Sequence, residues 1–375
     1  MDNVQPASIA AAPPSSLKSV QERFADTIAG YLFLLPFVVV YFLFRIYPLF
    51  RGLYISLHEW ELVGTHREYV GLENYRSLLW NNLQWDIPYQ LILRVAGLAL
   101  TAVVLWWLVR RDRIGRIAAA VLFVSAVAIF AGILGLHPQE GAARWGDELF
   151  REAAKNTLYF VILSTPSIVI VGLLLAVALN RPWPIMGLFR TIFFSSYIFS
   201  VSVITLIWVM VLSPRQGILG HFLEIFGAEP IAWLTDKDLA MPAIVITTLW
   251  WTVGFNMILF LAGLQDIPSE VYEAAKLDGA GPLVNFFRVT LPLLKRTTVA
   301  VVVLQVMFSF QIFGQVYLMT RGGPAGSTRV LVLEIYQTGF RDWMLGYASA
   351  MSMILFLFML GTSIVQISLT QEEEA

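Results

Sequence analysis

The segment Glu273–Pro292, EAAKLDGAGPLVNFFRVTLP, is polar, is broken by glycine and proline, and lies between two long apolar runs. The helix SEVYEAAKL, with Asp266 as a candidate cap before it, is expected to end near Gly279, which suits a left-handed stop. A second short helix, LVNFFRVT, is expected to start at Pro282 and to close at Pro292. A loop that only joined two apolar runs would need no such order, so the segment indicates a rigid part shaped to fit a partner.

The expected first helix of this segment has a surface suited to docking. Ala274 and Ala275 are small, so another protein can approach the backbone closely, while Val271, Tyr272 and Leu277 add an apolar face. Short helices of this kind bind in grooves. The alternative is an amphipathic loop that lies on a membrane surface.

Composition places the chain in a membrane. Of 375 residues, 58% are hydrophobic and 14% are charged, whereas a soluble domain carries about a quarter charged residues. The net charge of −1 gives no basic field for nucleic acid. The absence of cysteine excludes disulfides, thiolate metal sites and cysteine catalysis.

Apolar runs of about 20 residues recur, and such runs cross membranes as helices because unpaired backbone groups are costly in lipid. The predicted fold is therefore an all-α membrane protein, a polytopic helical bundle. Eight spans are predicted, at 28–48, 88–109, 116–136, 157–179, 190–212, 241–263, 298–319 and 349–369.

Positive charge sets the expected orientation. One very short loop holds four basic residues, Arg110, Arg111, Arg113 and Arg116. The positive-inside rule places this loop in the cytoplasm. Four predicted spans separate this loop from the loop 266–297, so the loop 266–297 is expected on the same, cytoplasmic side. The tails 1–26 and 371–375 are expected to be cytoplasmic by the same count. The histidines fall in the predicted outer segments without a metal-binding spacing; they are His58, His66, His137 and His221.

The predicted spans contain no Asp or Glu, and Arg94 is the only deep charge. A transport protein driven by protons or by membrane voltage usually keeps ionisable side chains inside its transmembrane segments. The energy for any uphill transport is therefore expected to enter from outside the spans.

The central segment resembles the cytoplasmic EAA motif of ABC importer permeases. In that family the motif forms a coupling helix that docks in a cleft of the ATPase subunit. The resemblance assigns this coupling role to Glu273, Ala274, Ala275, Asp278, Gly279, Leu291 and Pro292. The sequence DGAG (278–281) within the motif resembles that of the carbohydrate branch of the family.

Other segments resemble the same branch in the same order. They are YLFLLPFVVVYFLFRIYPLFRGLYISLHEWE (31–61), VGLENYRSLL (70–79), Asn-Thr-Leu (156–158), TRGGPAGST (320–328) and LGYASAMSMILF (345–356). The most similar type is the maltose/glycerol-phosphate group, in its first-subunit class, which is MalF- or UgpA-like.

One departure from the family pattern concerns 85–151, which inserts two apparent spans where the family usually passes directly to the Asn-Thr-Leu helix. The resemblance thus implies six core transmembrane helices plus an inserted two-helix membrane hairpin, all within a permease domain at 27–370. Peripheral, lipid-facing helices are the favoured interpretation of the hairpin, and a stabilising or partner-contacting role is the alternative.

Substrate contacts are expected on the spans that flank the coupling loop. Gln305 and Ser309 lie one helical turn apart, and the resemblance aligns these two, with Thr248 and Phe255, to sugar-contact positions. Asn256 belongs to the same polar and aromatic strip. For Gln305 and Ser309, hydrogen bonding between helices is an equal alternative. Hydrogen bonding between helices is the favoured interpretation for a second pair, Gln311 and Gln315.

The resemblance implies the membrane subunit of an ATP-driven importer that moves a sugar across a bacterial or archaeal cytoplasmic membrane. Its implied partners are an ATPase homodimer or heterodimer, a second permease, an extracytoplasmic solute-binding protein, the carbohydrate and membrane lipid. The chain lacks a phosphate-binding loop, so it is not expected to be an enzyme, and ATP and Mg would be bound by the partner. No catalytic or metal residue is predicted. The alternative function is a stand-alone secondary carrier or channel.

Overall fold

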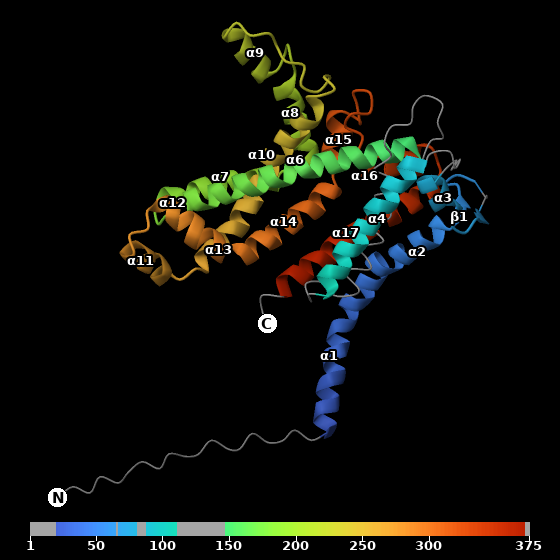
Figure 1. Cartoon of the computed structure of the whole chain (residues 1–375), viewed down its shortest axis with the longest axis horizontal. Coiled ribbons are helices and arrows are strands. Elements are labelled where there is room, and N and C mark those ends of the chain that lie inside the picture. The colour runs from blue at the N-terminus through green and yellow to red at the C-terminus, as the bar shows by residue number, and fades with distance from the viewer. Residues whose placement is uncertain (1–19, 65–66, 81–87, 111–146, 372–375) are drawn as a thin grey trace, which may run out of the picture. The chain divides into compact units, whose positions relative to one another are not determined.

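The computed structural model is almost entirely helical (Figure 1). It describes residues 20–64, 67–80, 88–110 and 147–371. Several predicted features lie wholly or partly outside the described residues. They are the tails 1–26 and 371–375, the span 116–136 and much of the inserted hairpin 85–151, with Arg111, Arg113, Arg116, His66 and His137. The chain divides into two compact units, one ending at Tyr54 and the other beginning at Ile55.

The described part of the first unit is an apolar helical run. Its elements are α1 (Val20–Tyr41), the π-helical turn η1 (Phe42–Ile46) and most of α2 (Tyr47–Ser56). The stretch Tyr31–Ser56 has a mean hydropathy of 2.1 and is long enough to cross a membrane. It contains most of the span predicted at 28–48.

The second unit begins with a small antiparallel hairpin and two helices. These are β1 (His58–Trp60), β2 (Arg67–Tyr69), α3 (Glu73–Trp80) and α4 (Pro88–Arg110). Helix α4 corresponds to the span predicted at 88–109. Asn74 of α3 fastens the hairpin, because its side-chain amide donates to the carbonyls of Ser56 and His58 at 2.8 and 3.0 Å.

A helical bundle follows. It contains α6 (Glu148–Leu179), α7 (Pro184–Ile198), α8 (Val201–Leu212), α9 (Ile218–Ile225), α10 (Ala240–Gln265), α14 (Lys295–Phe310), α15 (Gly314–Met319), α16 (Leu331–Tyr336), the π-helical turn η3 (Gln337–Arg341) and α17 (Leu345–Gln371). Helix α6 packs against α10, α14 and α16, and α10 packs against α7. Phe160, Phe260 and Met351 are fully buried, one in each of three apolar clusters. Helices α10 and α14, which flank the segment α11–α13 (269–293) in sequence, therefore both pack against α6.

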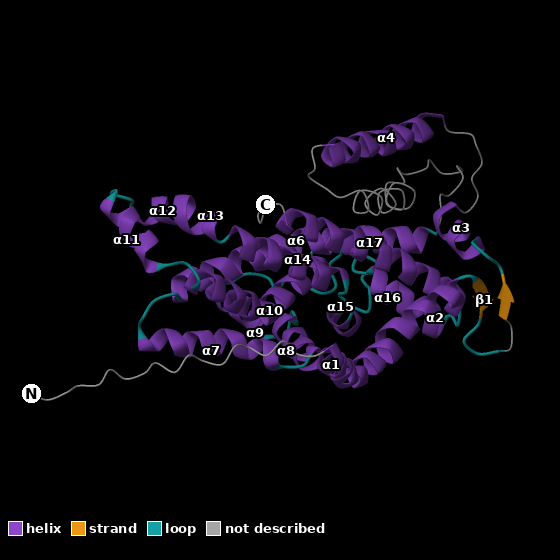
Figure 2. Ribbon diagram, turned by 90° about the horizontal axis from the view of Figure 1, so that it is seen from below, coloured by secondary structure: helices purple, strands orange, loops and turns teal. Residues whose placement is uncertain are grey.

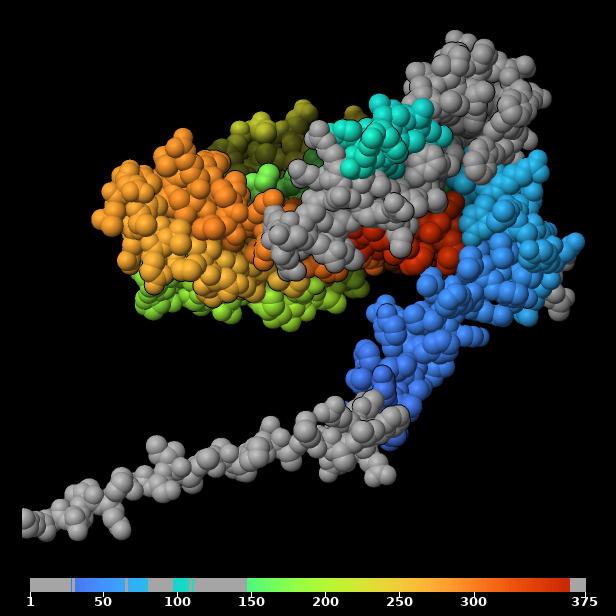
Figure 3. All heavy atoms as spheres, turned by 60° about the horizontal axis from the view of Figure 1, so that its bottom comes forward, coloured from blue at the N-terminus to red at the C-terminus, as the bar shows by residue number. Residues whose placement is uncertain are grey.

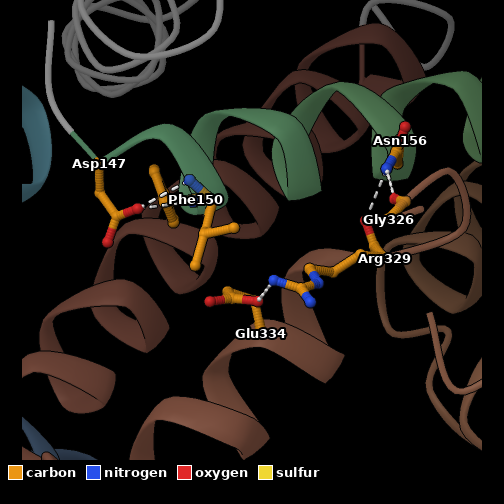
Figure 4. A network of polar contacts seen from close by, with 7 residues as sticks. Asp147, Phe150, Asn156, Gly326, Arg329 and Glu334 are labelled. Atoms are coloured by element: carbon orange, nitrogen blue, oxygen red, sulfur yellow. Dashed lines mark hydrogen bonds and ion pairs between the residues drawn. The ribbon is translucent and has the colours of Figure 1, made fainter. Parts of the chain in front are cut away.

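Helix α6 is longer than the predicted span 157–179. It begins at Glu148, because Asp147 caps it and accepts hydrogen bonds from the backbone N–H groups of Leu149 and Phe150 at 2.8 and 3.2 Å (Figure 4). A carboxylate that accepts from the free N–H groups of a first turn stabilises a helix start. The Asn-Thr-Leu segment thus lies inside the helix and does not open it.

Two spans that the sequence predicts as single helices are broken. The segment 190–212 consists of α7 and α8, which meet at an angle of 101°. The segment 298–319 consists of most of α14 and all of α15, with 311–313 between them. At the first break, Trp251 Nε1 donates to the carbonyl oxygen of Phe199 at 3.1 Å. Such partners are what allow a helix to break at membrane depth.

Within the described residues, four helices are long and apolar enough to cross a membrane, or up to six if each bent pair is one span. The bent pairs are α7 with α8, and Pro282–Leu293 with α14. The predicted all-α membrane fold is confirmed. The prediction of one continuous helix at 190–212 and another at 298–319 is wrong, because each segment is broken.

The segment between α10 and α14 forms the two expected short helical stretches. They are α11 (Ser269–Leu277), followed by α12 (Pro282–Asn285), the π-helical turn η2 (Phe286–Thr290) and α13 (Leu291–Leu293). Gly279 has a φ of +80° after α11, as predicted. Two details differ: Asp266 ends α10 instead of capping α11, and the second stretch passes Pro292 to end at Leu293. Proline fits there because the first turn of α13 does not need its missing N–H.

Helices α11, α12 and α13 lie at one end of the second unit, while β1 and α3 lie at the opposite end (Figures 1 and 2). Within the second unit, the segment α11–α13 is therefore separated from β1 and α3 by the length of the bundle.

Candidate functional site

A cavity of about 280 Å³ lies in the second unit where the two breaks approach α6, α10 and α14. All five predicted substrate residues line it: Thr248, Phe255, Asn256, Gln305 and Ser309. The remaining lining residues are Phe160, Tyr197, Val201, Trp251, Thr252, Phe308, Gln311, Ile312, Phe313, Gly314 and Gln315. The helical periodicity and the resemblance thus select residues that converge in space.

The polar residues on α10 and α14 bond to one another across the cavity wall. Asn256 Nδ2 donates to Gln305 Oε1 at 3.1 Å, and Gln305 Nε2 donates to Ser309 Oγ at 3.2 Å. From α6, Ser164 Oγ and Thr165 Oγ1 lie 3.1 and 3.3 Å from Ser309 Oγ. This network joins three helices, so the predicted interhelical bonding of Gln305 and Ser309 is present in the structure.

Aromatic side chains form much of the cavity surface. Tyr197 of α7 stacks on Phe255 with ring centres 4.9 Å apart and an interplanar angle of 19°, and Phe308 meets Phe255 edge-on at 6.4 Å. Flat apolar faces beside a few placed polar groups are typical of small-molecule sites. Sequence reasoning missed Tyr197, because α7 does not flank the coupling loop and nothing in its local pattern sets this tyrosine apart.

Gln311 and Gln315 behave differently from Gln305. In the described part of the chain, neither side chain has a hydrogen-bond partner, although both line the cavity. Within the described residues, the interhelical bonding favoured for this pair is not present. The break at 311–313 is the physical reason, since the two glutamines do not share one continuous helix.

A close contact holds the two broken helices together beside the cavity. A Cβ on Gly314 would lie 2.9 Å from Val201 Cγ2, so glycine lets the start of α15 approach the start of α8. Among the described residues that line the cavity, none is charged. The site can therefore offer hydrogen bonds and aromatic faces, but no charge to balance an ionic ligand.

The predicted coupling residues lie on an open surface (Figure 3). Glu273, Ala274, Asp278, Gly279 and Pro292 are exposed, and Ala275 and Leu291 are half-buried. Leu277 is 90% exposed and Leu283 is 74% exposed. Tyr272 links α11 to η2, because its hydroxyl accepts a hydrogen bond from Thr290 Oγ1 at 3.4 Å. The segment therefore presents two large apolar side chains on its exposed surface.

Two segments that resemble family motifs, 156–158 and 320–328, meet at the N-terminal part of α6. Asn156 Nδ2 donates to the carbonyls of Gly326 and Arg329 at 2.9 and 3.0 Å (Figure 4). Thr157 Oγ1 accepts from the backbone N–H of Leu331 at 2.8 Å. The Asn-Thr-Leu segment therefore anchors the Gly-Gly-Pro segment.

A buried acid lies next to this anchor. Glu334 of α16 is 4% exposed and pairs with Arg329 at 3.5 Å (Figure 4). Burial raises the pKa of Glu334, Arg329 lowers it, and the carboxylates of Asp147 and Asp342 raise it further, with a net upward shift. Within the described residues, no group of three or more His, Asp or Glu is placed to hold a metal ion.

Comparisons with known proteins agree with this architecture. The family model described as "Binding-protein-dependent transport system inner membrane component" matches residues 156–371. The chain is 28% identical over 347 residues to the probable ABC transporter permease protein YurN of Bacillus subtilis, which covers 91% of this chain and 95% of the relative. It is 34% identical over 236 residues to the lactose transport system permease protein LacF of Rhizobium radiobacter, covering 61% of this chain and 79% of the relative.

A solved structure has the same fold. One chain of a bacterial ABC transporter involved in the import of the acidic polysaccharide alginate matches with a TM-score of 0.65 and 19% identity, over 94% of this chain and 98% of that chain. Because the family model spans more than half of the sequence, this chain belongs to the binding-protein-dependent inner membrane components, the permeases of ABC transporters.

Proposed function

We propose that this permease is one of two membrane subunits of an ATP-driven importer, that it carries a carbohydrate across the cytoplasmic membrane, and that it couples to a separate ATPase through α11. The main support is the convergence of Thr248, Phe255, Asn256, Gln305 and Ser309 on one uncharged, aromatic-lined cavity. The proposed partners are the ATPase subunits, which bind ATP and Mg, a second permease, an external solute-binding protein and lipid. Both termini are proposed to be cytoplasmic.

The connectivity suggests how motion at α11 reaches the cavity. Helix α10 leads directly into α11, and η2, which contacts α11 through Tyr272 and Thr290, leads through α13 into α14. Because α10 and α14 carry all five predicted substrate residues, a displacement of α11 moves two walls of the cavity. Closure of the ATPase would thus bias the permease between inward-open and outward-open states, which is allosteric coupling between two sites.

The cargo class follows from the cavity and from the relatives. A lining of amides, hydroxyls and aromatic rings without charge favours a neutral sugar. One relative is named for lactose, and a structural neighbour takes part in alginate import. These names support a carbohydrate, and the uncharged lining among the described residues favours a neutral one.

The substitution Glu273→Lys tests the coupling role. In purified complex reconstituted into vesicles, we expect sugar uptake to fall strongly while membrane insertion is kept, because the charge change lies on the exposed face of α11. Glu270→Lys makes the same charge change outside the EAA motif and should act less. Uptake by the Glu273→Lys complex at the wild-type rate would show that α11 does not couple to the ATPase.

Co-purification separates this proposal from a stand-alone carrier. Secondary carriers also use broken helices around a central site, so the breaks in 190–212 and 298–319 do not distinguish the two classes. An importer subunit should bring an ATPase and a second permease through purification, whereas a carrier would be isolated alone and would transport without ATP.

A further inference from the structure

The polar side chains of the cavity fall into two groups, and the difference bears on how cargo is selected. The first group is occupied by the protein itself. Asn256 Nδ2 donates both to Thr252 O at 3.2 Å and to Gln305 Oε1 at 3.1 Å, so both of its hydrogens are used. Gln305 in turn donates to Ser309, which also contacts α6 through Ser164. These residues hold the walls together.

The second group consists of Gln311, which begins the break between α14 and α15, and Gln315, which lies in the first turn of α15. Within the described residues, neither amide has a partner. Gln315 is only 8% exposed, yet it lines the cavity. The Gln315 amide is not among the fully buried atoms without a partner in the described residues, so it faces the cavity, where water or a ligand can satisfy it.

On the basis of the proposed function, we propose that Gln311 and Gln315 determine cargo specificity by hydrogen bonding to the hydroxyl groups of a neutral sugar, whereas Gln305 mainly holds the cavity wall. Each amide offers a carbonyl oxygen that accepts and an NH₂ that donates, which matches a hydroxyl that does both. The stacked pair Tyr197 and Phe255 supplies a flat apolar surface in the same cavity. Together these residues fit the polar rim and the apolar face of a sugar ring.

One substitution made at three positions tests this division. Gln315→Met, Gln311→Met and Gln305→Met remove the same amide and keep a side chain of similar length. Each variant is purified in the full transporter complex and reconstituted into vesicles with ATP. The probe is whichever of radiolabelled maltose, lactose and trehalose the wild-type complex accumulates fastest. KM, maximal rate and the Tm of the complex are measured, and Phe255→Ala serves as a test of the cavity itself.

We expect Gln315→Met to raise KM by roughly tenfold or more, since a hydrogen bond to cargo is lost, and to change the order of preference among the three sugars. Gln311→Met should act in the same direction. Neither should lower Tm, because neither amide bonds within the protein. Gln305→Met should lower Tm, because it breaks the link between Asn256 and Ser309, and its effect on KM should be smaller than that of Gln315→Met.

The outcomes separate this inference from the proposed function. If Phe255→Ala impairs uptake but Gln315→Met changes KM no more than Gln305→Met, the cavity carries cargo and the specificity role of Gln315 is wrong. A fall in Tm for Gln315→Met as large as that for Gln305→Met would show a structural role and would also overturn the inference. If neither Phe255→Ala nor any glutamine variant alters uptake, the proposed function of the cavity fails as well.

Discussion

Asn156 and Gly326 are 170 residues apart in the chain, yet the side-chain amide of Asn156 lies 2.9 Å from the carbonyl oxygen of Gly326. The same nitrogen reaches Arg329 O at 3.0 Å, and the neighbouring Thr157 binds the backbone of Leu331. One turn of α6 therefore fixes both the glycine-rich segment and the start of α16. Two stretches of sequence that resemble family motifs thus form a single structural unit.

The substitution Asn156→Asp tests this anchor. It keeps the shape of the side chain and removes the donor, so two backbone carbonyls lose their partner. We expect a loss of about 1–3 kcal/mol in the free energy of unfolding, seen as a lower Tm of the purified complex. Exposed Glu152→Gln, one turn earlier on α6, is the control and should leave Tm unchanged. An unchanged Tm for Asn156→Asp would mean that the contacts to Gly326 and Arg329 do not stabilise the fold.

The contact between α7 and α10 depends on Gly254. A Cβ at this position would lie 2.1 Å from the carbonyl oxygen of Phe193, a backbone atom that cannot simply rotate away. Gly254→Ala should therefore push the two helices apart at a cost of about 1–3 kcal/mol. Gly187→Ala, on α7 with nothing within 4 Å of its Cβ, is the matched control and should be neutral or slightly stabilising. Thermal unfolding of both complexes distinguishes them, and equal Tm values would refute the packing role.

The exposed apolar surface of α11 should be needed for assembly with the ATPase. Leu277→Asp places a charge where an interface would exclude water, so the ATPase retained by affinity-purified permease should fall by about tenfold or more. Ile218→Asp on α9 is a control of the same kind, because Ile218 is 75% exposed and lies in a predicted outer segment. If both variants retained the ATPase equally well, Leu277 would have no part in docking.

Stability should depend on pH through Glu334. Burial raises the pKa of Glu334 above its ordinary value of 4.5, so the folded protein holds this proton more tightly than the unfolded chain. The free energy of unfolding contributed by this group is therefore highest below that ordinary value and falls as the pH rises through the raised pKa. Glu334→Gln should flatten this decline in a Tm series between about pH 5 and pH 8. Glu152→Gln should keep the wild-type slope, and an equal slope in all three proteins would contradict the assignment.

Local features of the coupling segment were predictable because they depend on neighbouring residues. The helix Ser269–Leu277, the positive φ of Gly279 and the second start at Pro282 follow from capping and from the stereochemistry of glycine and proline. The role of Asp266 was predicted wrongly. Its position is set by the end of α10, which continues to Gln265, and tertiary packing decides where that helix stops.

The broken helices were not predictable from apolar length. Residues 199–200 and 311–313 interrupt runs that are hydrophobic enough to cross a membrane. The first break is supported by Trp251, which lies 52 residues away from Phe199 in sequence, so the signal is not local. Gly314 is the one nearby clue to the second break. For the same reason the sequence located five cavity residues by helical spacing and resemblance but missed Tyr197.

The two exposed leucines of the coupling segment also bear on the life of the protein before assembly. In the proposed orientation, a newly made copy without its ATPase presents Leu277 and Leu283 to the cytosol. Exposed apolar side chains invite aggregation and capture by chaperones and quality-control proteases. Surplus copies should then be degraded, and the cell would keep the permease and its ATPase in balanced amounts without a separate mechanism for counting them.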